Sequence, residues 1–152
     1  MLIYIFMEQL IYTPEHPPSE IEKNDLNAFL FQHLDQYGDT AQDILKAINY
    51  ALSNENNKGG MIIATYYNSL LTGAVVINAT GMEDYIPENI LVYIATHKDY
   101  RGMGIGKNLL QTAIDQTSGS IALHVEADNP ALQLYEKVGF VNKYLEMRLI
   151  KQ

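Results

Sequence analysis

The chain has 152 residues, the length of one average domain, and it contains no cysteine. At this size folding buries ~70% of the surface of the unfolded chain, so one core is expected. The missing cysteine excludes disulfides, thiolate catalysis and cysteine metal sites, and it agrees with a reducing compartment. With 18 acidic and 10 basic residues the net charge is −8, which argues against general nucleic-acid binding and suits cationic partners. A solvated acidic surface is the simpler interpretation of that charge.

No apolar run reaches the ~18 residues that a membrane span requires. Met1 to Met7 is apolar but lacks a basic region and a small-residue cleavage site, so a secretory signal is not expected. We therefore expect a cytoplasmic protein without membrane association. Translation starting at Met7 instead of Met1 is an open alternative.

The first part of the chain predicts one strand and two amphipathic helices. Leu2 to Tyr12 suits a strand, and the proline-rich residues 14–18 end it. Apolar residues then recur at helical spacing from Ser19 until Gly38. Thr40-Ala41-Gln42-Asp43 matches a helix-capping pattern and starts a second helix.

The remaining strands and helices follow from turn signals and apolar runs. Met61–Tyr67 and Leu70–Asn78 flank Asn68-Ser69 and predict a hairpin. A loop over 79–88 precedes an apolar strand over 90–96. Beyond the glycine-rich segment we expect a strand over 120–127, a helix over 129–138 and a last strand over 141–150.

Three glycines at alternate positions, Gly102, Gly104 and Gly106, separate the strand over 90–96 from a segment with apolar residues at helical spacing. A strand, a phosphate loop and a helix are the simplest interpretation. The first N–H groups of a helix lack partners and the helix dipole is positive there, which favours a phosphate ligand.

Two common phosphate loops do not fit this spacing. A dinucleotide motif that starts at Gly102 meets Lys107, and one that starts at Gly104 meets Leu109, where each needs glycine. A triphosphate loop needs glycine at 101 and serine or threonine at 108, but arginine and asparagine stand there. A nucleotide-binding fold is therefore disfavoured.

The remaining pattern, Arg101-x-x-Gly104-x-Gly106 after Tyr100, resembles the acyl-CoA pyrophosphate loop of the GCN5-related N-acetyltransferases, the GNAT superfamily. Residues 129–140, Asn-Pro-Ala-Leu-Gln-Leu-Tyr-Glu-Lys-Val-Gly-Phe, are similar to the second signature of that superfamily. The two motifs together cover the C-terminal two-fifths of the chain.

The resemblance implies a single domain over residues 1–152 with an α/β (α+β) fold: a mixed, mostly antiparallel sheet flanked by helices. It also implies that the parallel strands over 90–96 and 121–127 splay apart and that acyl-CoA lies between them. Splayed strands leave backbone groups unpaired, and the pantetheine arm can add there like a strand, at Ile94, Ala95 and Thr96.

The same resemblance assigns the pyrophosphate to the glycine loop, where Arg101 adds positive charge. The expected loop residues are Gly102, Met103, Gly104, Ile105, Gly106 and Lys107, the last five through their N–H groups. Asn129 is expected to cap the helix that follows Pro130, and the resemblance adds a cofactor contact. No metal is expected.

For catalysis, Tyr135 matches a tyrosine that commonly protonates the departing thiolate in this family. A phenol with a pKa of ~10 is a weaker acid than a thiol at ~8.5, so its surroundings must help. Core packing is the competing interpretation, because Tyr135 belongs to an apolar helical stripe with Ala131, Leu134 and Val138.

The general base is less well defined. Ile90 and Val92 stand where some members carry a glutamate or histidine. On the next strand His124 and Glu126 share one face by alternation and are the candidate bases, with water as the competitor. The residues that could line the acceptor site are Tyr37, Tyr66, Tyr67, Glu83, Asp84, Tyr85 and Glu88.

We therefore predict an acetyl-CoA-dependent N-acetyltransferase that acts on a primary amine of a small molecule or peptide. The alternative is a non-catalytic acyl-CoA sensor or partner-binding domain with the same fold. The sequence identifies neither the acceptor amine nor the oligomeric state, and a homodimer is one candidate.

Overall fold

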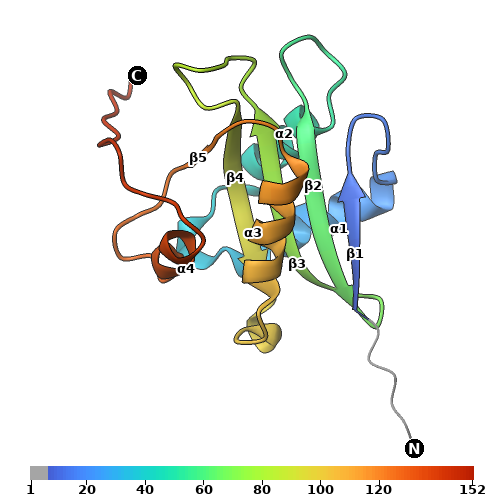
Figure 1. Cartoon of the computed structure of the whole chain (residues 1–152). Helices are drawn as coiled ribbons and strands as arrows, with labels where there is room; N and C mark the ends of the chain where they lie inside the picture. The colour runs from blue at the N-terminus through green and yellow to red at the C-terminus, as the bar shows by residue number, and fades with distance from the viewer. Residues whose placement is uncertain (1–6) are drawn as a thin grey trace, which may run out of the picture.

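The computed structural model describes residues 7–152 and contains one five-stranded sheet in the order β1-β2-β3-β4-β5 (Figure 1). All neighbouring strands are antiparallel except the parallel pair β4–β5. The strands are β1 (Met7–Tyr12), β2 (Gly60–Tyr67), β3 (Leu70–Ala79), β4 (Asn89–Thr96) and β5 (Ile121–Leu123). The mixed, mostly antiparallel sheet that we expected is confirmed. The part of the predicted first strand before Met7 lies outside the described residues.

Four α-helices and two 3-10 turns complete the fold within residues 7–152. The helices are α1 (Glu20–His33), α2 (Ala41–Ala51), α3 (Ile105–Gln116) and α4 (Ala131–Lys137), and the turns are η1 (Asp35–Tyr37) and η2 (Lys98–Tyr100). The predicted capping pattern is confirmed, because the Thr40 side chain accepts a hydrogen bond from the Asp43 N–H at 3.1 Å. No helix within residues 7–152 is long and apolar enough to cross a membrane.

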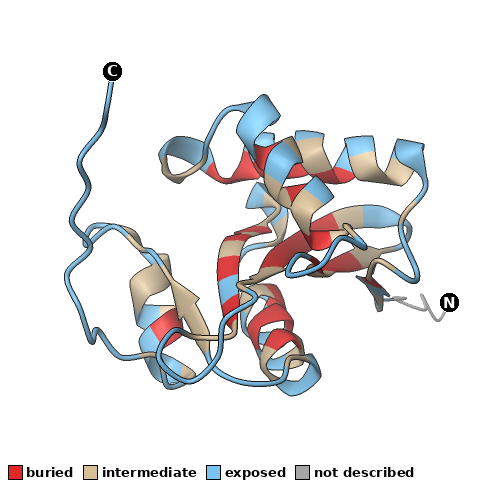
Figure 2. Ribbon diagram, turned by 90° about the horizontal axis from the view of Figure 1, so that it is seen from above, coloured by how far each residue is buried: buried red, intermediate tan, exposed pale blue. Residues whose placement is uncertain are grey.

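The sheet separates two layers of helices (Figure 2). Helices α1 and α2 cover one face and bury Leu26, Leu30, Ile44 and Ile48 against it. Helix α3 packs against the opposite face, and α4 adds Tyr135 to the same apolar cluster. The fully buried apolar residues of β2 and β3 are therefore divided between the two faces, with Ile62 and Val76 in the α1–α2 layer and Ile63 and Val75 in the α3 layer.

Helix α3 lies directly on β3 at Gly73. A Cβ at Gly73 would approach Ile105 Cγ2 to 2.6 Å and Leu109 Cδ1 to 2.9 Å, so only glycine fits there. This contact holds the first turn of α3 against the sheet and fixes the position of the loop before it.

Strand β4 carries a bulge at Val92. Leu91 pairs with Ile77 and Tyr93 pairs with Val76, so Val92 is the extra residue. The bulge changes the faces of the strand: Leu91 packs in the α3 layer, whereas Tyr93 packs in the α1–α2 layer. Further along, Ile94 returns to the α3 layer.

Strand β5 pairs with β4 at only three positions, from Asn89↔Ile121 to Leu91↔Leu123. Beyond Leu123 the chain is irregular, and residues 92–96 of β4 have no partner on that side. The predicted splay of these parallel strands is confirmed. The prediction that the strand continues to Ala127 is wrong, because the splay removes its hydrogen-bonding partner.

The last predicted strand, over 141–150, is also wrong for the single chain. Residues 141–152 have no regular secondary structure and are exposed along their whole length (Figure 2). The alternation that suggested a strand is present, but no described segment of the same chain pairs with it.

Candidate active site

The opening between β4 and β5 is one side of the candidate site. After Leu91 the two strands separate, and the backbone of Ile94, Ala95 and Thr96 borders the gap. On the other side β4 remains paired with β3 as far as Thr96. An extended ligand can therefore hydrogen-bond to β4 from the open side without disturbing the rest of the sheet.

The glycine loop follows at the end of β4. After η2, Gly102 and Gly104 adopt φ of 81° and 80°, and no atom lies within 4 Å of where a Cβ at either would stand. Gly104 is the N-cap of α3 and provides no side-chain cap. The first helical hydrogen bond runs from the Asn108 N–H to the Gly104 carbonyl, so the N–H groups of Ile105, Gly106 and Lys107 have no intrahelical acceptor and can bind a ligand.

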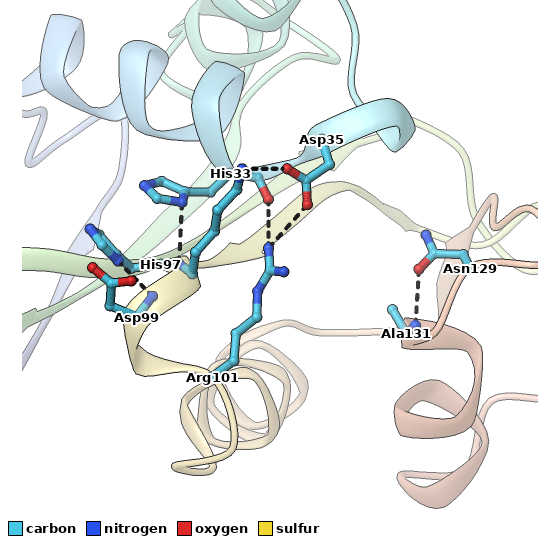
Figure 3. Close-up of polar contacts among 8 residues, drawn as sticks. His33, Asp35, His97, Asp99, Arg101, Asn129 and Ala131 are labelled. Carbon is cyan, nitrogen blue, oxygen red and sulfur yellow. Dashed lines mark hydrogen bonds and ion pairs between the residues drawn. The ribbon is translucent and has the colours of Figure 1, made fainter.

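Arg101 does not point its guanidinium at this helix start (Figure 3). Its Nη2 donates to the His33 carbonyl at 3.2 Å and to Asp35 Oδ2 at 3.3 Å. Lys98 pairs with the other oxygen of the same carboxylate at 3.1 Å. Lys98, first, and Arg101 hold the pKa of Asp35 below its usual range. Arg101 therefore ties the loop to the end of α1, and its charge is partly offset.

Two histidines fill the space behind this ion pair. The rings of His33 and His97 stack with centroids 4.3 Å apart, and His33 Nδ1 accepts from the Lys98 N–H at 3.3 Å (Figure 3). His97 Nδ1 accepts from the Asp99 N–H and caps η2. Burial, then the charges of His97, Lys98 and Arg101, lower the pKa of His33. The loop thus rests on a platform of two imidazole rings, His33 and His97.

Helix α4 lies beyond the gap and begins at Ala131, two residues later than predicted, with Pro130 as its N-cap. Asn129 Oδ1 accepts from the Ala131 N–H at 2.9 Å, so Asn129 caps the turn that Pro130 opens (Figure 3). In the same helix Leu134 Cδ2 would lie 3.2 Å from a Cβ at Gly106, which brings α4 against the first turn of α3.

Tyr135 is buried, with 6% of its surface exposed, and its ring meets Phe140 edge-on at 5.9 Å. Burial raises the pKa of Tyr135 to about 12. The structure therefore supports the packing interpretation of the apolar stripe. It also leaves the phenol protonated at neutral pH, as a hydrogen-bond donor must be.

Comparison with known proteins agrees with this geometry. Residues 57–142 match the family model described as acetyltransferase (GNAT) domain, which is more than half of the chain. The chain belongs to the GNAT acetyltransferases. Members of this family use acetyl-CoA. A search of curated proteins finds no match.

Solved structures share the fold across almost the whole chain. The aminoglycoside N-acetyltransferase AAC(6')-Iy in complex with CoA has a TM-score of 0.70 at 12% identity, with 99% of both chains covered. A ribosomal-protein-alanine N-acetyltransferase from Brucella melitensis biovar Abortus 2308 has a TM-score of 0.63 at 13% identity and covers 96% of this chain and 99% of its own. A putative acetyl transferase from Pyrococcus furiosus has a TM-score of 0.61 at 24% identity, with 95% and 100% covered.

The two candidate bases of this GNAT chain lie in the irregular segment after β5. His124 and Glu126 are both exposed, and neither belongs to a strand. The alternation that placed them on one face therefore does not apply beyond Leu123. Their assignment as bases stays a prediction.

The tyrosines that we proposed for the acceptor site do not form one group. The Tyr66 hydroxyl lies 3.3 Å from that of Tyr12, and the Tyr67 ring lies against Tyr100. Tyr37 donates to the Asp128 carbonyl at 3.1 Å and so joins η1 to the loop before α4. Of these tyrosines, Tyr37 is the one whose hydroxyl contacts the loop between β5 and α4.

The acidic loop before β4 stabilises the start of the parallel β4–β5 pair through hydrogen bonds to Glu88. Glu88 Oε1 accepts from the Ser120 N–H at 3.0 Å, and Glu88 Oε2 accepts from the Asp84 N–H at 3.3 Å. Tyr85, in contrast, is 80% exposed. This loop lies at the end of β4 opposite the glycine loop (Figure 1).

Sequence reasoning missed one polar pair beside the bulge. The Tyr93 hydroxyl donates to Asp39 Oδ2 at 2.5 Å, across 54 residues of sequence. Burial, and then this hydrogen bond, raise the pKa of Tyr93 above its ordinary range. The only signal in the sequence was a tyrosine inside an otherwise apolar strand.

Across residues 7–152, no three histidine or acidic side chains form a group that could hold a metal ion.

Proposed function

We propose that this GNAT protein is an acetyl-CoA-dependent N-acetyltransferase that acts on a primary amine of a small molecule or peptide. One observation carries the proposal: the sheet opens between β4 and β5 at the strand end from which the glycine loop leads into α3. A ligand with an extended amide arm and a diphosphate fits this order of features. We take residues 1–152 as one domain and the cytoplasm as its location.

The cofactor would lie along β4 and end at the start of α3. The pantetheine arm would bond to the backbone at Ile94, Ala95 and Thr96. The diphosphate would accept from the N–H groups of residues 103–107, where Gly104 keeps the approach open. Gly102 shapes the turn, Asn129 orders the start of α4, and Arg101 holds the loop against α1.

Tyr135 would donate a hydrogen bond to the sulfur as the thiolate departs. Complete transfer of a proton from a phenol whose pKa is about 12 to a thiolate, whose acid has a pKa of ~8.5, would cost about 5 kcal/mol. The same apolar surroundings disfavour a free thiolate, because they also raise the pKa of the thiol and reduce this cost. A hydrogen bond that strengthens as charge develops on sulfur is therefore the role that the burial supports.

The amine must lose a proton before or during attack, and His124, Glu126 or a water molecule would accept it. An amine acceptor is supported by two proteins of the same fold, an aminoglycoside N-acetyltransferase and a ribosomal-protein-alanine N-acetyltransferase. A net charge of −8 also attracts cationic molecules.

Calorimetry and a turnover assay test this function. We expect CoA and acetyl-CoA each to bind with one-to-one stoichiometry, and release of free thiol when an accepted amine is added. The amine panel should include an aminoglycoside, a peptide with an N-terminal alanine, and small polyamines. No binding of either cofactor would exclude the acetyltransferase, whereas binding without turnover on any amine would favour the acyl-CoA sensor.

A further inference from the structure

A groove lies between strand β1 and helix α3, on the face of the sheet that α3 covers. Its volume is about 380 Å³, within the ~300–1,000 Å³ range of small-molecule sites. Polar side chains from β1, β2 and α3 line it: Gln9, Thr65, Asn108, Gln111 and Thr112. Of the loop residues proposed for the diphosphate, the groove includes only Ile105, so it is a second surface of the molecule.

Thr65 is the least usual side chain of this groove. It stands opposite Gln9 in the β1–β2 pair, so the two side chains project from the same face of the sheet. Thr65 is only 4% exposed, and its Oγ1 has no hydrogen-bond partner within residues 7–152. Such a hydroxyl is uncommon, because burial removes its contact with water and provides nothing in return. A ligand in the groove would supply the missing hydrogen bond.

A side-chain hydrogen bond joins the two walls of the groove next to Thr65. Thr112 Oγ1 on α3 donates to Gln9 Oε1 on β1 at 2.7 Å, at the surface of the protein. Surface side chains exchange partners with little cost in free energy. A ligand that takes the place of this hydrogen bond therefore gains the Gln9 amide, the Thr112 hydroxyl and access to Thr65.

The chemistry of the lining indicates the class of ligand. Its hydroxyl and amide side chains are uncharged, and each can both donate and accept hydrogen bonds. Glu8 also borders the groove, but alternation along β1 turns its carboxylate to the opposite face, where Tyr12 packs in the α1–α2 layer. An anion only accepts and an ammonium only donates, whereas a sugar hydroxyl does both. Met7 and Ile105 add apolar contact for the C–H groups of a sugar ring.

We propose that the groove between β1 and α3 binds a small neutral sugar, which replaces the Gln9–Thr112 hydrogen bond and bonds to Thr65 Oγ1. The free protein carries the cost of an unpaired buried hydroxyl, and binding removes that cost. Affinity therefore depends on Thr65 more than on the exposed groups. The proposal does not depend on acetyl transfer, because Gln9, Thr65 and Thr112 lie outside the proposed cofactor site.

Nuclear magnetic resonance on the full chain tests the site. Methyl glucoside and maltose are the neutral probes, and we expect saturable shifts at the Thr65 methyl, the Ile105 methyls and the Gln9 side-chain amide. Glucuronate is the matched anionic probe and should bind at least about 10-fold more weakly than methyl glucoside. Shifts that rise linearly with either neutral sugar would show only its general effect as an excluded solute and would overturn the proposal.

Two buried threonines provide a matched pair of variants. Thr72 is fully buried, like Thr65, but its Oγ1 donates to the Thr65 carbonyl at 3.1 Å. Thr72→Val should therefore lower the stability toward urea, whereas Thr65→Val removes an unpaired hydroxyl and should not lower it. Sugar affinity should change in the opposite way: it should fall at least about 10-fold in Thr65→Val and stay near that of the wild type in Thr72→Val.

Gln9→Met is a further variant at an exposed position, which keeps the length of the side chain and removes its hydrogen-bonding groups. It should stay folded and bind both neutral sugars more weakly. Wild-type affinity in Thr65→Val or in Gln9→Met would overturn the proposal. An equal loss of stability in Thr65→Val and Thr72→Val would overturn it as well, because the Thr65 hydroxyl would then have a structural partner.

Discussion

The two walls of the cofactor gap differ in how they are built. Strand β4 lies inside the sheet, and helices on both faces cover it. Strand β5 has three residues at the edge, and Tyr135 is the one buried residue between residue 114 and the C-terminus. The cofactor would therefore lie between a rigid wall, β4, and a second wall, β5, that makes few packing contacts with the rest of the protein.

The difference indicates a division of tasks. The rigid wall presents backbone groups and the helix start, which must be positioned before the ligand arrives if binding is to be strong. The lighter wall carries Tyr135 and the segment after β5 with the proposed bases His124 and Glu126, where small movements would accommodate an incoming amine. Four substitutions test the two walls, the joint between them and the platform behind the loop.

The largest expected effect is on the rigid wall, at Gly104. Gly104→Glu puts a negative charge beside the proposed diphosphate, at a φ of 80° that side chains rarely adopt. We expect CoA affinity to fall by at least about 100-fold, or ~3 kcal/mol. Isothermal calorimetry measures it.

Gly104→Gln is the matched control, because it has the same size and backbone strain without the charge. It should bind CoA more tightly than Gly104→Glu and less tightly than the wild type. Equal affinity in all three proteins would remove the loop from the cofactor site.

On the lighter wall, Tyr135→Phe removes the hydroxyl and keeps the ring against Phe140. We expect kcat to fall by about 100-fold with CoA affinity unchanged, since the hydroxyl acts only on the departing sulfur. Thiol release with an accepted amine measures kcat. An unchanged kcat would leave Tyr135 with a packing role alone.

The joint between the walls is Asn89, which is buried at the start of β4. Its Nδ2 donates to the Ser118 carbonyl at 2.7 Å and to the Ser120 carbonyl at 3.3 Å. Asn89→Ala removes both side-chain hydrogen bonds and keeps only the one from the residue 89 N–H to the Ser120 carbonyl, so it should lower the free energy of unfolding by ~1–3 kcal/mol. Urea titration measures this change, and amide exchange at residues 121–123 should become faster. The control is Asn108→Ala at an exposed position, whose free energy of unfolding should stay within ~0.5 kcal/mol of the wild type. Unchanged amide exchange at β5 in Asn89→Ala would show that Asn89 does not connect β4 to β5.

The two walls were not equally predictable from the sequence. Local signals located the glycine loop, the Thr40 cap and the Asn129 cap, because each depends on residues a few positions apart. The segment over 141–150 has the alternation of a strand, yet a strand forms only where a partner edge is available, and the sequence does not show which edge that is.

Contacts between side chains that are far apart in the sequence could not be predicted either. Tyr93 and Asp39 are 54 residues apart, and the bulge at Val92 that directs Tyr93 toward Asp39 leaves no mark in the apolar pattern of β4. Arg101 has the spacing of a phosphate ligand, but the carboxylate that holds it, Asp35, comes from a 3-10 turn with no motif of its own.

The smallest expected effect concerns the platform behind the loop. Burial first, and then the charges of His97, Lys98 and Arg101, lower the pKa of His33 in the folded protein, whereas in the unfolded chain it is ~6.5. Below that pH the unfolded state binds the proton more readily, so the contribution of His33 to stability is complete above pH ~6.5 and is lost as the pH falls toward the folded pKa. Urea titrations at pH 7.5 and at pH 5.5 should therefore show a smaller loss of stability for His33→Gln than for wild type, since glutamine can still accept from the Lys98 N–H. The exposed His16→Gln should follow the wild type, and an equal loss in the His33 variant would mean that the platform does not sense pH.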